Sequence, residues 1–158
     1  MSGVQAPALS VLSAAGVCRV PGAAEALAAL LAERRRMAFR WGVHDCCMFA
    51  AEAIRVQTGI DPARHLRGRY ATALQAARVV QACGGLLAIG SAALGEPLRA
   101  PLLACSGDLG MVNSRGPDGE PVQVLAVCIG EWWQVPVADG LALRPLSDGL
   151  MAWRVGCG

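Results

Sequence analysis

The first helical pattern lies after residue 22, where an alanine-rich stretch carries Leu27, Leu30, Leu31 and Arg34 on one face. Alanine has the highest intrinsic helix propensity, so this stretch is predicted to form a helix. The run Arg34-Arg35-Arg36 falls in its last turns, where the negative end of the helix dipole favours cations. The alternative for these arginines is a contact with an acidic partner.

A second helix is predicted to begin after Asp45 and to stop at Gly59. Asp45 is a favourable N-cap, because its carboxylate accepts hydrogen bonds from the free N–H groups of the first turn. A glycine after the last turn is typical of a helix C-terminus. The apolar positions between them follow the i, i+3, i+4, i+7, i+8 rule. They are Cys46, Phe49, Ala50, Ala53 and Ile54.

Two further helices precede a change of pattern. We expect a third helix from Tyr70 to Cys83 and a short fourth from Leu86 to Leu94, separated by Gly84-Gly85. After Pro97 the pattern becomes that of short strands with turn residues between them. The expected strands are 109–112, 122–129, 132–137, 141–144 and 151–155. The second of these is almost wholly apolar, which is typical of a central strand.

Helices followed by an antiparallel meander define the α+β class. A chain of 158 residues has the length of one domain. We therefore expect an N-terminal arm over residues 1–20 and a single domain over residues 21–158. In this domain the N-terminal helices pack on a C-terminal antiparallel β-sheet. No membrane insertion is expected, because the long uncharged stretch 79–95 is interrupted by glycine and too short to span a bilayer.

Charge and composition narrow the kinds of partner. Charged residues make up 16% of the chain, below the ~25% of ordinary domains, which suggests that a partner covers part of the surface. The net charge is only +2, so the chain lacks the strong positive field that nucleic-acid binding requires. The arm carries no charged side chain before Arg19, and we expect it to order on a neighbouring protein.

Seven cysteines are many for this length, but their spacing contains no C-x-x-C pair. A zinc knuckle or a redox motif is therefore not expected, and nothing in the spacing supports an iron–sulfur cluster. Most of the cysteines lie among apolar neighbours, and we interpret them as buried free thiols of a reducing compartment. No cofactor and no metal are predicted.

The most informative residue for chemistry is Cys46. A cysteine in the first turn of a helix faces unpaired N–H groups, and the positive end of the dipole favours thiolate over thiol. Such a thiolate is the nucleophile of papain-like hydrolases. Cys46 is a better candidate than Cys47 because it follows the Asp45 cap directly. The alternative is a buried structural cysteine on the apolar stripe of the helix.

Several short motifs carry a resemblance. The pattern D-C-x-x-F at Asp45-Cys46, then Gly107-Asp108 before a strand, then a strand that ends at Gly130, resembles the NlpC-type, papain-like cysteine peptidases that cleave bacterial cell-wall peptides. A longer series resembles a group of small proteins encoded in phage and prophage tail gene clusters. Its members here are Trp41-Gly42, Asp45-Cys46-Cys47, Phe49, Ala51, Thr58-Gly59, Asp61-Pro62, Arg67 to Tyr70, Gly107-Asp108 and Ala152 to Val155.

The resemblance implies a nucleophile at Cys46 and a histidine on the strand that ends at Gly130, where this chain has Val124. Gln134 falls at the third, polar position of the family, on the following strand. A peptidase needs a general acid to protonate the leaving amine, and valine cannot supply a proton. Of the two histidines, His44 lies two residues before Cys46 but on the wrong element to act as the base. His65 lies in a basic loop.

Two groups of residues are candidates for partner contacts. Arg64, Arg67 and Arg69 make a basic loop that suits an anionic glycan or an acidic protein patch, unless they are simply solvated or Arg69 pairs with Asp61. Trp132 and Trp133 are consecutive on a strand, so one indole points to each face, one into the core and the other outward as an interface anchor.

The resemblance therefore implies a phage tail-tip or hub-associated protein with a degenerate NlpC-type fold and a structural or adaptor role. Its location would be the virion tail, after synthesis in the host cytoplasm, and its partners other tail-tip or hub proteins. The main alternative is an active cysteine peptidase that cleaves peptidoglycan peptides during genome entry. A third interpretation is a module that binds muropeptides in the substrate cleft of the peptidase fold without cleaving them.

Overall fold

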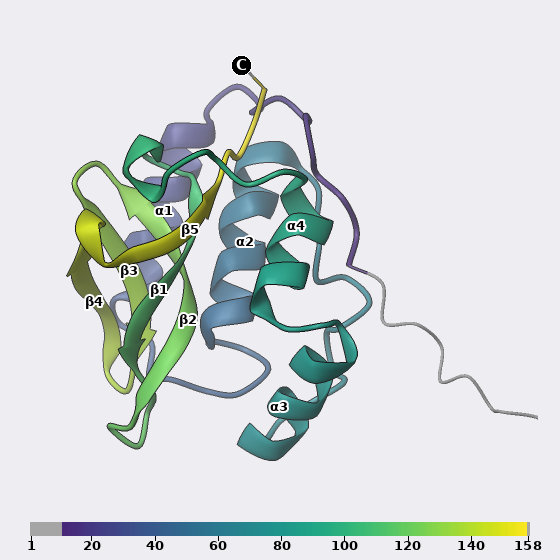
Figure 1. The fold of residues 1–158 in the computed structure, drawn as a ribbon, viewed down its shortest axis with the longest axis vertical. Helices are drawn as coiled ribbons and strands as arrows, with labels where there is room; N and C mark the ends of the chain where they lie inside the picture. The colour runs from purple at the N-terminus through teal and green to yellow at the C-terminus, as the bar shows by residue number, and fades with distance from the viewer. Residues whose placement is uncertain (1–10, 158) are drawn as a thin grey trace, which may run out of the picture.

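A computed structural model describes residues 11–157, and across these residues the chain is α+β, as predicted, with four α-helices and a five-stranded antiparallel sheet (Figure 1). Expectations that concern residues 1–10 lie outside the described residues. The helices are α1 (Ala23–Arg34), α2 (Cys46–Thr58), α3 (Ala73–Ala82) and α4 (Leu86–Leu94).

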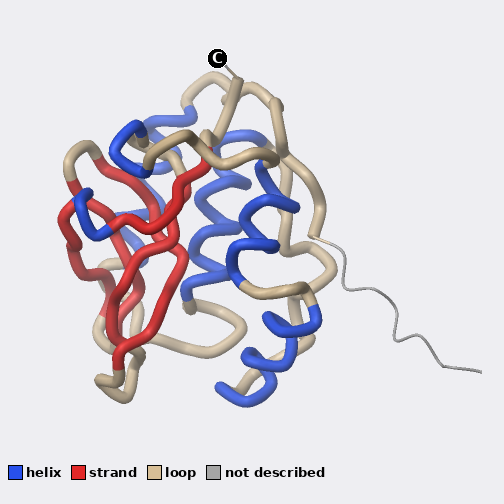
Figure 2. The backbone as a smooth tube through the Cα atoms, viewed as in Figure 1, coloured by secondary structure: helices blue, strands red, loops and turns tan. Residues whose placement is uncertain are grey.

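The sheet follows the expected strands closely. They are β1 (Leu109–Arg115), β2 (Pro121–Ile129), β3 (Trp132–Val137), β4 (Gly140–Pro145) and β5 (Gly149–Trp153). The strand order is β4-β3-β2-β1-β5, so β1 to β4 form a meander and β5 returns to pair with β1. The apolar strand β2 is the central one, as its composition predicts. Figure 2 shows the strands gathered on one side and the helices α2, α3 and α4 on the other.

The helix α2 lies at the centre of the core. Its predicted apolar stripe is confirmed, since Phe49, Ala50, Ala53 and Ile54 are all at most 2% exposed. Phe49 and Ala53 share a hydrophobic cluster with Leu27 and Leu30 of α1 and Val127 of β2, and Ala50 and Ile54 share another with Leu109 and Leu125. The central helix is thereby fixed against both α1 and the middle of the sheet.

A separate cluster fills the other face of the sheet. Trp133 is fully buried there, and its indole N–H donates to the carbonyl of Leu146 at 3.1 Å. The short 3₁₀ helices Pro101–Leu103 and Leu146–Asp148 lie beside this cluster. Gly110 of β1 must be glycine, because a Cβ there would lie 2.5 Å from the Trp133 ring.

The third helix begins later than predicted, at Ala73 rather than Tyr70. Thr72 is its N-cap, and the Thr72 hydroxyl accepts a hydrogen bond from the Gln75 N–H at 3.2 Å. Tyr70 precedes the helix and is held elsewhere, as described below.

The described part of the arm, residues 11–20, packs on its own domain. Ala14 is fully buried and donates to the carbonyl of Ala93 at 2.7 Å, and Val20 donates to the carbonyl of Gln57 at 2.8 Å. Figure 1 shows this purple segment running past α4 and α2 to meet the C-terminal end of the chain.

A disulfide between Cys18 and Cys157 joins the two ends. The expectation that the cysteines are free thiols is therefore wrong for these two. Cys128 is a fully buried thiol, Cys46 and Cys47 are half-buried, and Cys105 is exposed. The pairing arises because the fold brings the arm beside the last residues of the chain.

The motif Gly107-Asp108 anchors the same junction. The Asp108 carboxylate is fully buried and accepts from the main-chain N–H groups of Cys105 at 2.8 Å and Val155 at 3.0 Å. It also forms ion pairs with Arg19 at 3.4 Å and Arg154 at 3.3 Å. In this structure Asp108 therefore ties the arm, the start of the sheet and the C-terminal segment together, which is a structural role.

No single helix among the described residues has the length and apolar composition needed to cross a membrane. The helices α3 and α4 have this length and apolar composition only when they are counted together, and the chain bends by 60° at the break between them.

Candidate functional site

The candidate site is built on Asp45, which caps α2 as predicted. Asp45 is 2% exposed, and its Oδ1 accepts from the main-chain N–H of Met48 at 2.9 Å. Its Oδ2 accepts from the Gly42 N–H and from the Tyr70 hydroxyl, both at 2.7 Å. One buried carboxylate thus fixes the loop before α2, the first turn of α2 and the loop before α3.

This network explains why two distant motifs occur together. Gly42 has a φ of 80°, and a Cβ there would meet the carbonyl oxygen of Tyr70 at 2.3 Å, so only glycine fits. Burial and the neighbouring Asp45 raise the pKa of Tyr70 far above its usual range, so the hydroxyl stays protonated and donates. The motifs W-G-x-x-D and R-G-R-Y are therefore two halves of one hydrogen-bonded unit.

Cys46 is the first residue of α2, where the cap holds its sulfur at the positive end of the helix. A hydrogen bond from the Cys47 thiol lowers the pKa of Cys46, and hydrogen bonds with the main chain of Leu125 and Cys47 lower it further. These outweigh burial and the Asp45 charge, both of which act in the opposite direction. The same thiol–thiol bond, together with burial, raises the pKa of Cys47. Of the pair, Cys46 is therefore the thiol that more readily becomes a thiolate.

The geometry of the sheet explains why Leu125 is available to the sulfur. The pairing of β2 with β3 ends at Val127 opposite Gln134. Leu125 therefore lies beyond the part of β2 that pairs with β3, and its main chain forms a hydrogen bond with the Cys46 sulfur.

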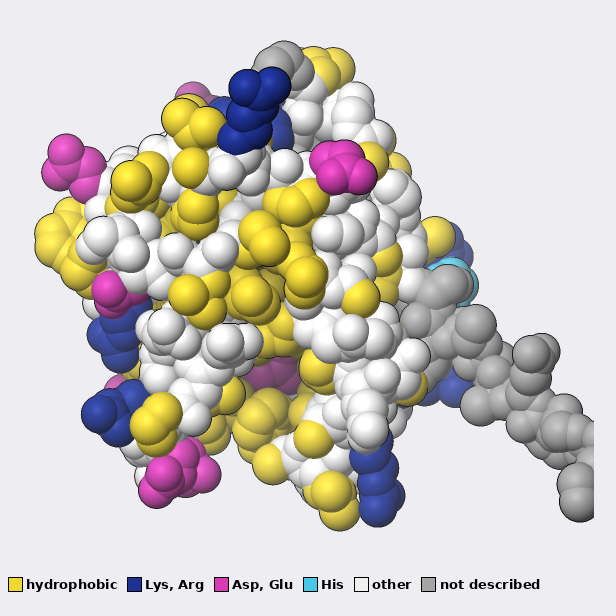
Figure 3. Space-filling model, viewed as in Figure 1, with side chains coloured by type: hydrophobic (Ala, Val, Ile, Leu, Met, Phe, Trp, Pro, Cys, Tyr) yellow, Lys and Arg dark blue, Asp and Glu magenta, His cyan; other side chains and the backbone are white. Residues whose placement is uncertain are grey.

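Cys46 opens into a cavity of about 250 Å³ between the first turn of α2, the helices α3 and α4, and the β1–β2 hairpin. Figure 3 shows this hollow, with yellow apolar side chains around it and one magenta acidic group at its floor; Asp45 is the acidic residue that lines it. Most of the lining is apolar, and it includes Phe39, Trp41, Leu66, Val79, Val80 and Ile89.

His44 points away from this cavity. The ring is fully buried, with Nδ1 3.3 Å from a guanidinium nitrogen of Arg34 and Nε2 3.3 Å from the carbonyl oxygen of Gly140. Because arginine only donates, Nδ1 accepts and Nε2 carries the proton. Arg34 lies in the last turn of α1, as predicted, but it also donates to the Val43 carbonyl at 2.9 Å and is only 8% exposed. Both ring nitrogens therefore have hydrogen-bond partners, which fix the loop before α2 against α1 and the start of β4.

The buried His44 predicts a loss of stability in mild acid. Burial is the main cause that lowers the pKa of His44, and the Arg34 charge adds to it. As the pH falls through about 6.5, the unfolded chain gains a proton that folded His44 resists, so the free energy of unfolding falls, by at most about 1.4 kcal/mol per pH unit. Urea unfolding at about pH 7.5 and about pH 5.5 measures this change.

The matched variant is His44→Gln, which cannot take up a proton in this range. Its free energy of unfolding should change less between the two pH values than that of the wild type. Equal changes in the two proteins would show that His44 is not the group responsible.

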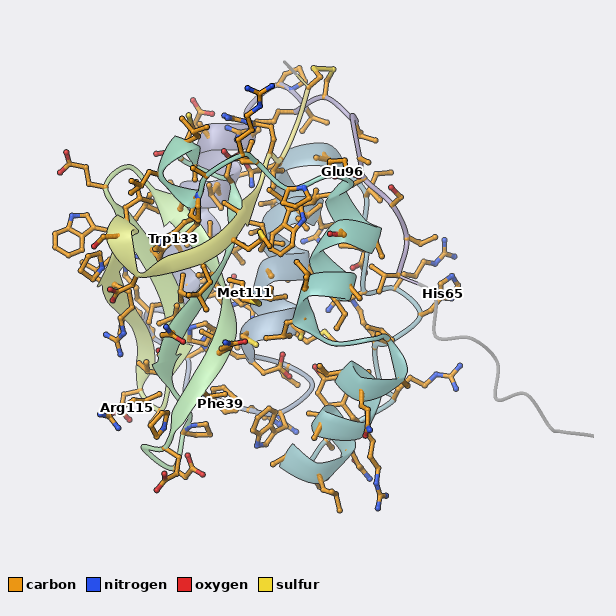
Figure 4. The ribbon with its side chains drawn as sticks, in the orientation of Figure 1. Phe39, His65, Glu96, Met111, Arg115 and Trp133 are labelled. Carbon is orange, nitrogen blue, oxygen red and sulfur yellow. A yellow bond between two sulfur atoms is a disulfide. The ribbon has the colours of Figure 1, made fainter. Side chains whose placement is uncertain are left out.

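The remaining predicted site residues are not gathered around Cys46. His65 is exposed on the loop before α3, on the opposite side of the helices from the sheet (Figure 4). Gln134 is 4% exposed, and its Oε1 has no hydrogen-bond partner among the described residues, but it does not line the cavity. Val124, by contrast, lines the same cavity as Cys46.

The basic loop divides into two kinds of arginine. Arg67 is paired twice, with Asp61 at 2.7 Å and with Glu52 at 2.7 Å, so it joins this loop to α2. The alternative pairing of Asp61 with Arg69 is not the one observed. Arg64 and Arg69 are exposed as well, and no ion pair of either is observed among the described residues.

The two adjacent tryptophans separate as the alternation of a strand requires. Trp133 is fully buried, whereas Trp132 is 44% exposed at the start of β3. Figure 4 places Trp133 within the sheet. Trp132 is therefore the indole available to a partner.

Reasoning from the sequence missed the bond of Tyr70 to Asp45, the contact of Arg34 with His44, and the cavity. Tyr70 and Gly42 both lie in motifs of the series that carries the resemblance. The occurrence of these two motifs in one chain was the only sequence signal of a contact between their residues. Within residues 11–157 no group of three His, Cys, Asp or Glu side chains is placed to hold a metal ion.

An α+β domain with a capped cysteine at the start of its central helix defines the class of this protein. Residues 18–155 match the domain of unknown function DUF6950, and the chain belongs to this family. No curated protein and no solved structure matches the chain.

Proposed function

We propose that this chain is a papain-like module of a phage tail tip that has lost peptide hydrolysis and acts as a structural or adaptor protein. The papain-like part rests on Cys46 at the capped start of α2, beside the central strand of an antiparallel sheet. The tail assignment rests on the series of motifs that resembles small tail-cluster proteins.

One observation carries the loss of hydrolysis. Cys46 shares its cavity with Val124, and neither histidine of the chain is positioned to exchange a proton with the sulfur. The nitrogens of His44 are engaged by Arg34 and Gly140, and His65 is exposed on another loop. The Asp45 carboxylate is occupied by three donors. A leaving amine would therefore find no general acid beside Cys46.

The surface supports an adaptor role. Trp132 is exposed on β3, next to the edge strand β4, where Leu143 is 46% exposed. Exposed aromatic side chains are frequent anchors of protein interfaces. The partners we propose are other tail-tip or hub proteins, with Arg64 and Arg69 available to an acidic surface.

The disulfide is compatible with this location. Disulfides persist on virion and cell surfaces, whereas the bacterial cytoplasm keeps thiols reduced. A tail protein made in the host cytoplasm would form the Cys18–Cys157 bond after release of the particle.

Peptidoglycan digestion tests the loss of hydrolysis. Wild-type protein and Cys46→Ala are incubated with purified sacculi, and soluble peptides are measured by mass spectrometry. We expect no release above the buffer control from either protein. Release by the wild type but not by Cys46→Ala would establish the alternative, an active cysteine peptidase, which the capped, low-pKa Cys46 favours.

Particle composition tests the tail role. Virions or tail particles from the strain that encodes this chain are purified and their proteins are quantified. We expect the chain at a fixed ratio to the tail-tip proteins, and a reduced ratio for Trp132→Ala but not for Leu87→Ala, which removes a similarly exposed side chain from α4. Absence of the wild-type chain from intact particles would contradict the tail assignment.

A further inference from the structure

The cavity beside Cys46 has a lining that does not suit a cell-wall peptide. Such peptides carry carboxylates, whereas the cavity walls are largely apolar and its floor holds the Asp45 carboxylate. The one cation in the lining, Arg115, is exposed on the β1–β2 hairpin and donates to the carbonyl of Gly119 at 2.9 Å. Small side chains of α3, Ala73, Ala76 and Ala77, leave the space open. A cavity of this lining favours a hydrocarbon chain, because burial of each methylene group is worth about 0.8 kcal/mol.

The groups around Cys46 also favour one kind of substrate bond over another. Cleaving an amide requires protonation of the amine that leaves. No histidine stands beside Cys46, and the neighbouring Cys47 thiol, with its raised pKa, holds its proton. A thioester has a different requirement, because its leaving thiolate departs without prior protonation. The interactions of Leu125 and Cys47 with the sulfur stabilise the attacking thiolate. Cys46 is therefore suited to exchange with a thioester rather than to hydrolysis of a peptide.

We propose that Cys46 is an S-acylation site that accepts a medium-length acyl group from an acyl thioester, with the acyl tail in the apolar cavity. The Cys46 thiolate attacks the carbonyl carbon and forms a new C–S bond. The donor's C–S bond breaks, and its sulfur leaves with the electron pair as a thiolate. The products are an acyl-Cys46 thioester and a free thiol of the donor, with no oxidant or reductant consumed.

The inference concerns the same cysteine as the proposed function and rests on its placing of a reactive thiol at Cys46. It does not depend on the tail assignment. An acyl group on Cys46 would present a covalently held apolar ligand at the mouth of the cavity, beside α3 and the β1–β2 hairpin.

The experiment incubates the full-length oxidised protein with octanoyl-coenzyme A and follows intact mass, with peptide mapping of the modified residue. We expect one octanoyl group on Cys46, removed by neutral hydroxylamine as a thioester is. Cys46→Ala should lose the adduct and Cys105→Ser, which removes an exposed thiol elsewhere, should keep it. Modification of Cys105 in place of Cys46 would overturn the proposal.

The second measurement compares rates of acyl transfer for acyl groups of different length and for variants of the cavity wall. Octanoyl transfer should be at least about tenfold faster than acetyl transfer, because two buried methylenes already account for that factor. Ala77→Leu fills the cavity from an exposed position on α3 and should slow octanoyl transfer. Ala82→Leu adds the same side chain to α3 away from the cavity and should not. Equal acetyl and octanoyl rates would contradict the assigned acyl pocket.

The outcomes separate this inference from the proposed function. Acylation of Cys46 without release of cell-wall peptides supports both. Release of peptides together with acylation would refute the loss of hydrolysis and leave the acyl site in place. No adduct on Cys46, in a protein whose Cys46 still reacts with iodoacetamide, would refute the acyl site alone.

Discussion

Opening the Cys18–Cys157 disulfide is expected to lower the free energy of unfolding by about 4–5 kcal/mol. The bond joins residues 139 positions apart, so it closes nearly the whole chain into a loop. In the chain-entropy account, a cross-link of this length removes many conformations from the unfolded state. The double variant Cys18→Ser/Cys157→Ser, compared with wild type by denaturant unfolding, measures the effect.

The folded junction should survive the loss of the bond. Asp108 still accepts from Val155 and Cys105, and the Arg19 side chain still donates to the Val155 carbonyl at 2.8 Å. The double serine variant should therefore fold, at lower stability. Cys105→Ser is the matched control, since it removes an exposed thiol and should change stability by less than about 0.5 kcal/mol. A double variant as stable as this control would show that the bond does not constrain the chain.

The central helix could be predicted from the sequence because every local signal agreed. Asp45 provides the cap, the apolar stripe has one period, and Gly59 ends the helix in the left-handed conformation with a φ of 80°. The strands were predictable for a similar reason, since turn residues separate short apolar runs. The order of β1 to β4 follows from short connections, which place consecutive antiparallel strands side by side. The last strand departs from this rule, since β5 pairs with β1 rather than with β4.

The features that escaped prediction depend on contacts between distant residues. Tyr70 has the character of a first helical residue, yet its hydroxyl is bound to Asp45, 25 positions earlier. Arg34 resembles a solvated cation at a helix end, yet it is buried because the loop before α2 turns back over it. The disulfide carries no local signal, because seven cysteines allow many pairings.

The motifs of the chain form three coupled pairs in the structure. Gly42 and Tyr70 both donate to Asp45, Arg67 binds Asp61, and Asp108 binds the segment that contains Arg154 and Val155. The first and third join segments far apart in the chain, whereas Arg67 and Asp61 lie in one loop, which Arg67 joins to α2 through Glu52. The residues of the short motifs therefore stabilise the fold that forms the Cys46 cavity, whether or not they also take part in chemistry there.

Asp45→Ala is expected to lower the free energy of unfolding by about 3–5 kcal/mol, since it leaves three donors without their acceptor. These are the N–H groups of Gly42 and Met48 and the hydroxyl of Tyr70. Because the carboxylate is 2% exposed, water cannot easily replace it. Tyr70→Phe removes only one of the three bonds and should cost about 1.5–3 kcal/mol.

Thr72→Ala is the matched control, because Thr72 is also an N-cap but is exposed and accepts one bond, from Gln75. Its loss should cost about 1 kcal/mol or less. Denaturant unfolding of the three variants ranks Asp45→Ala below Tyr70→Phe and both below Thr72→Ala in stability. Should Asp45→Ala lose no more than Thr72→Ala, the carboxylate would be an ordinary helix cap. The Cys46 cavity would then be held together by its apolar walls alone, without the hydrogen-bonded unit beneath it.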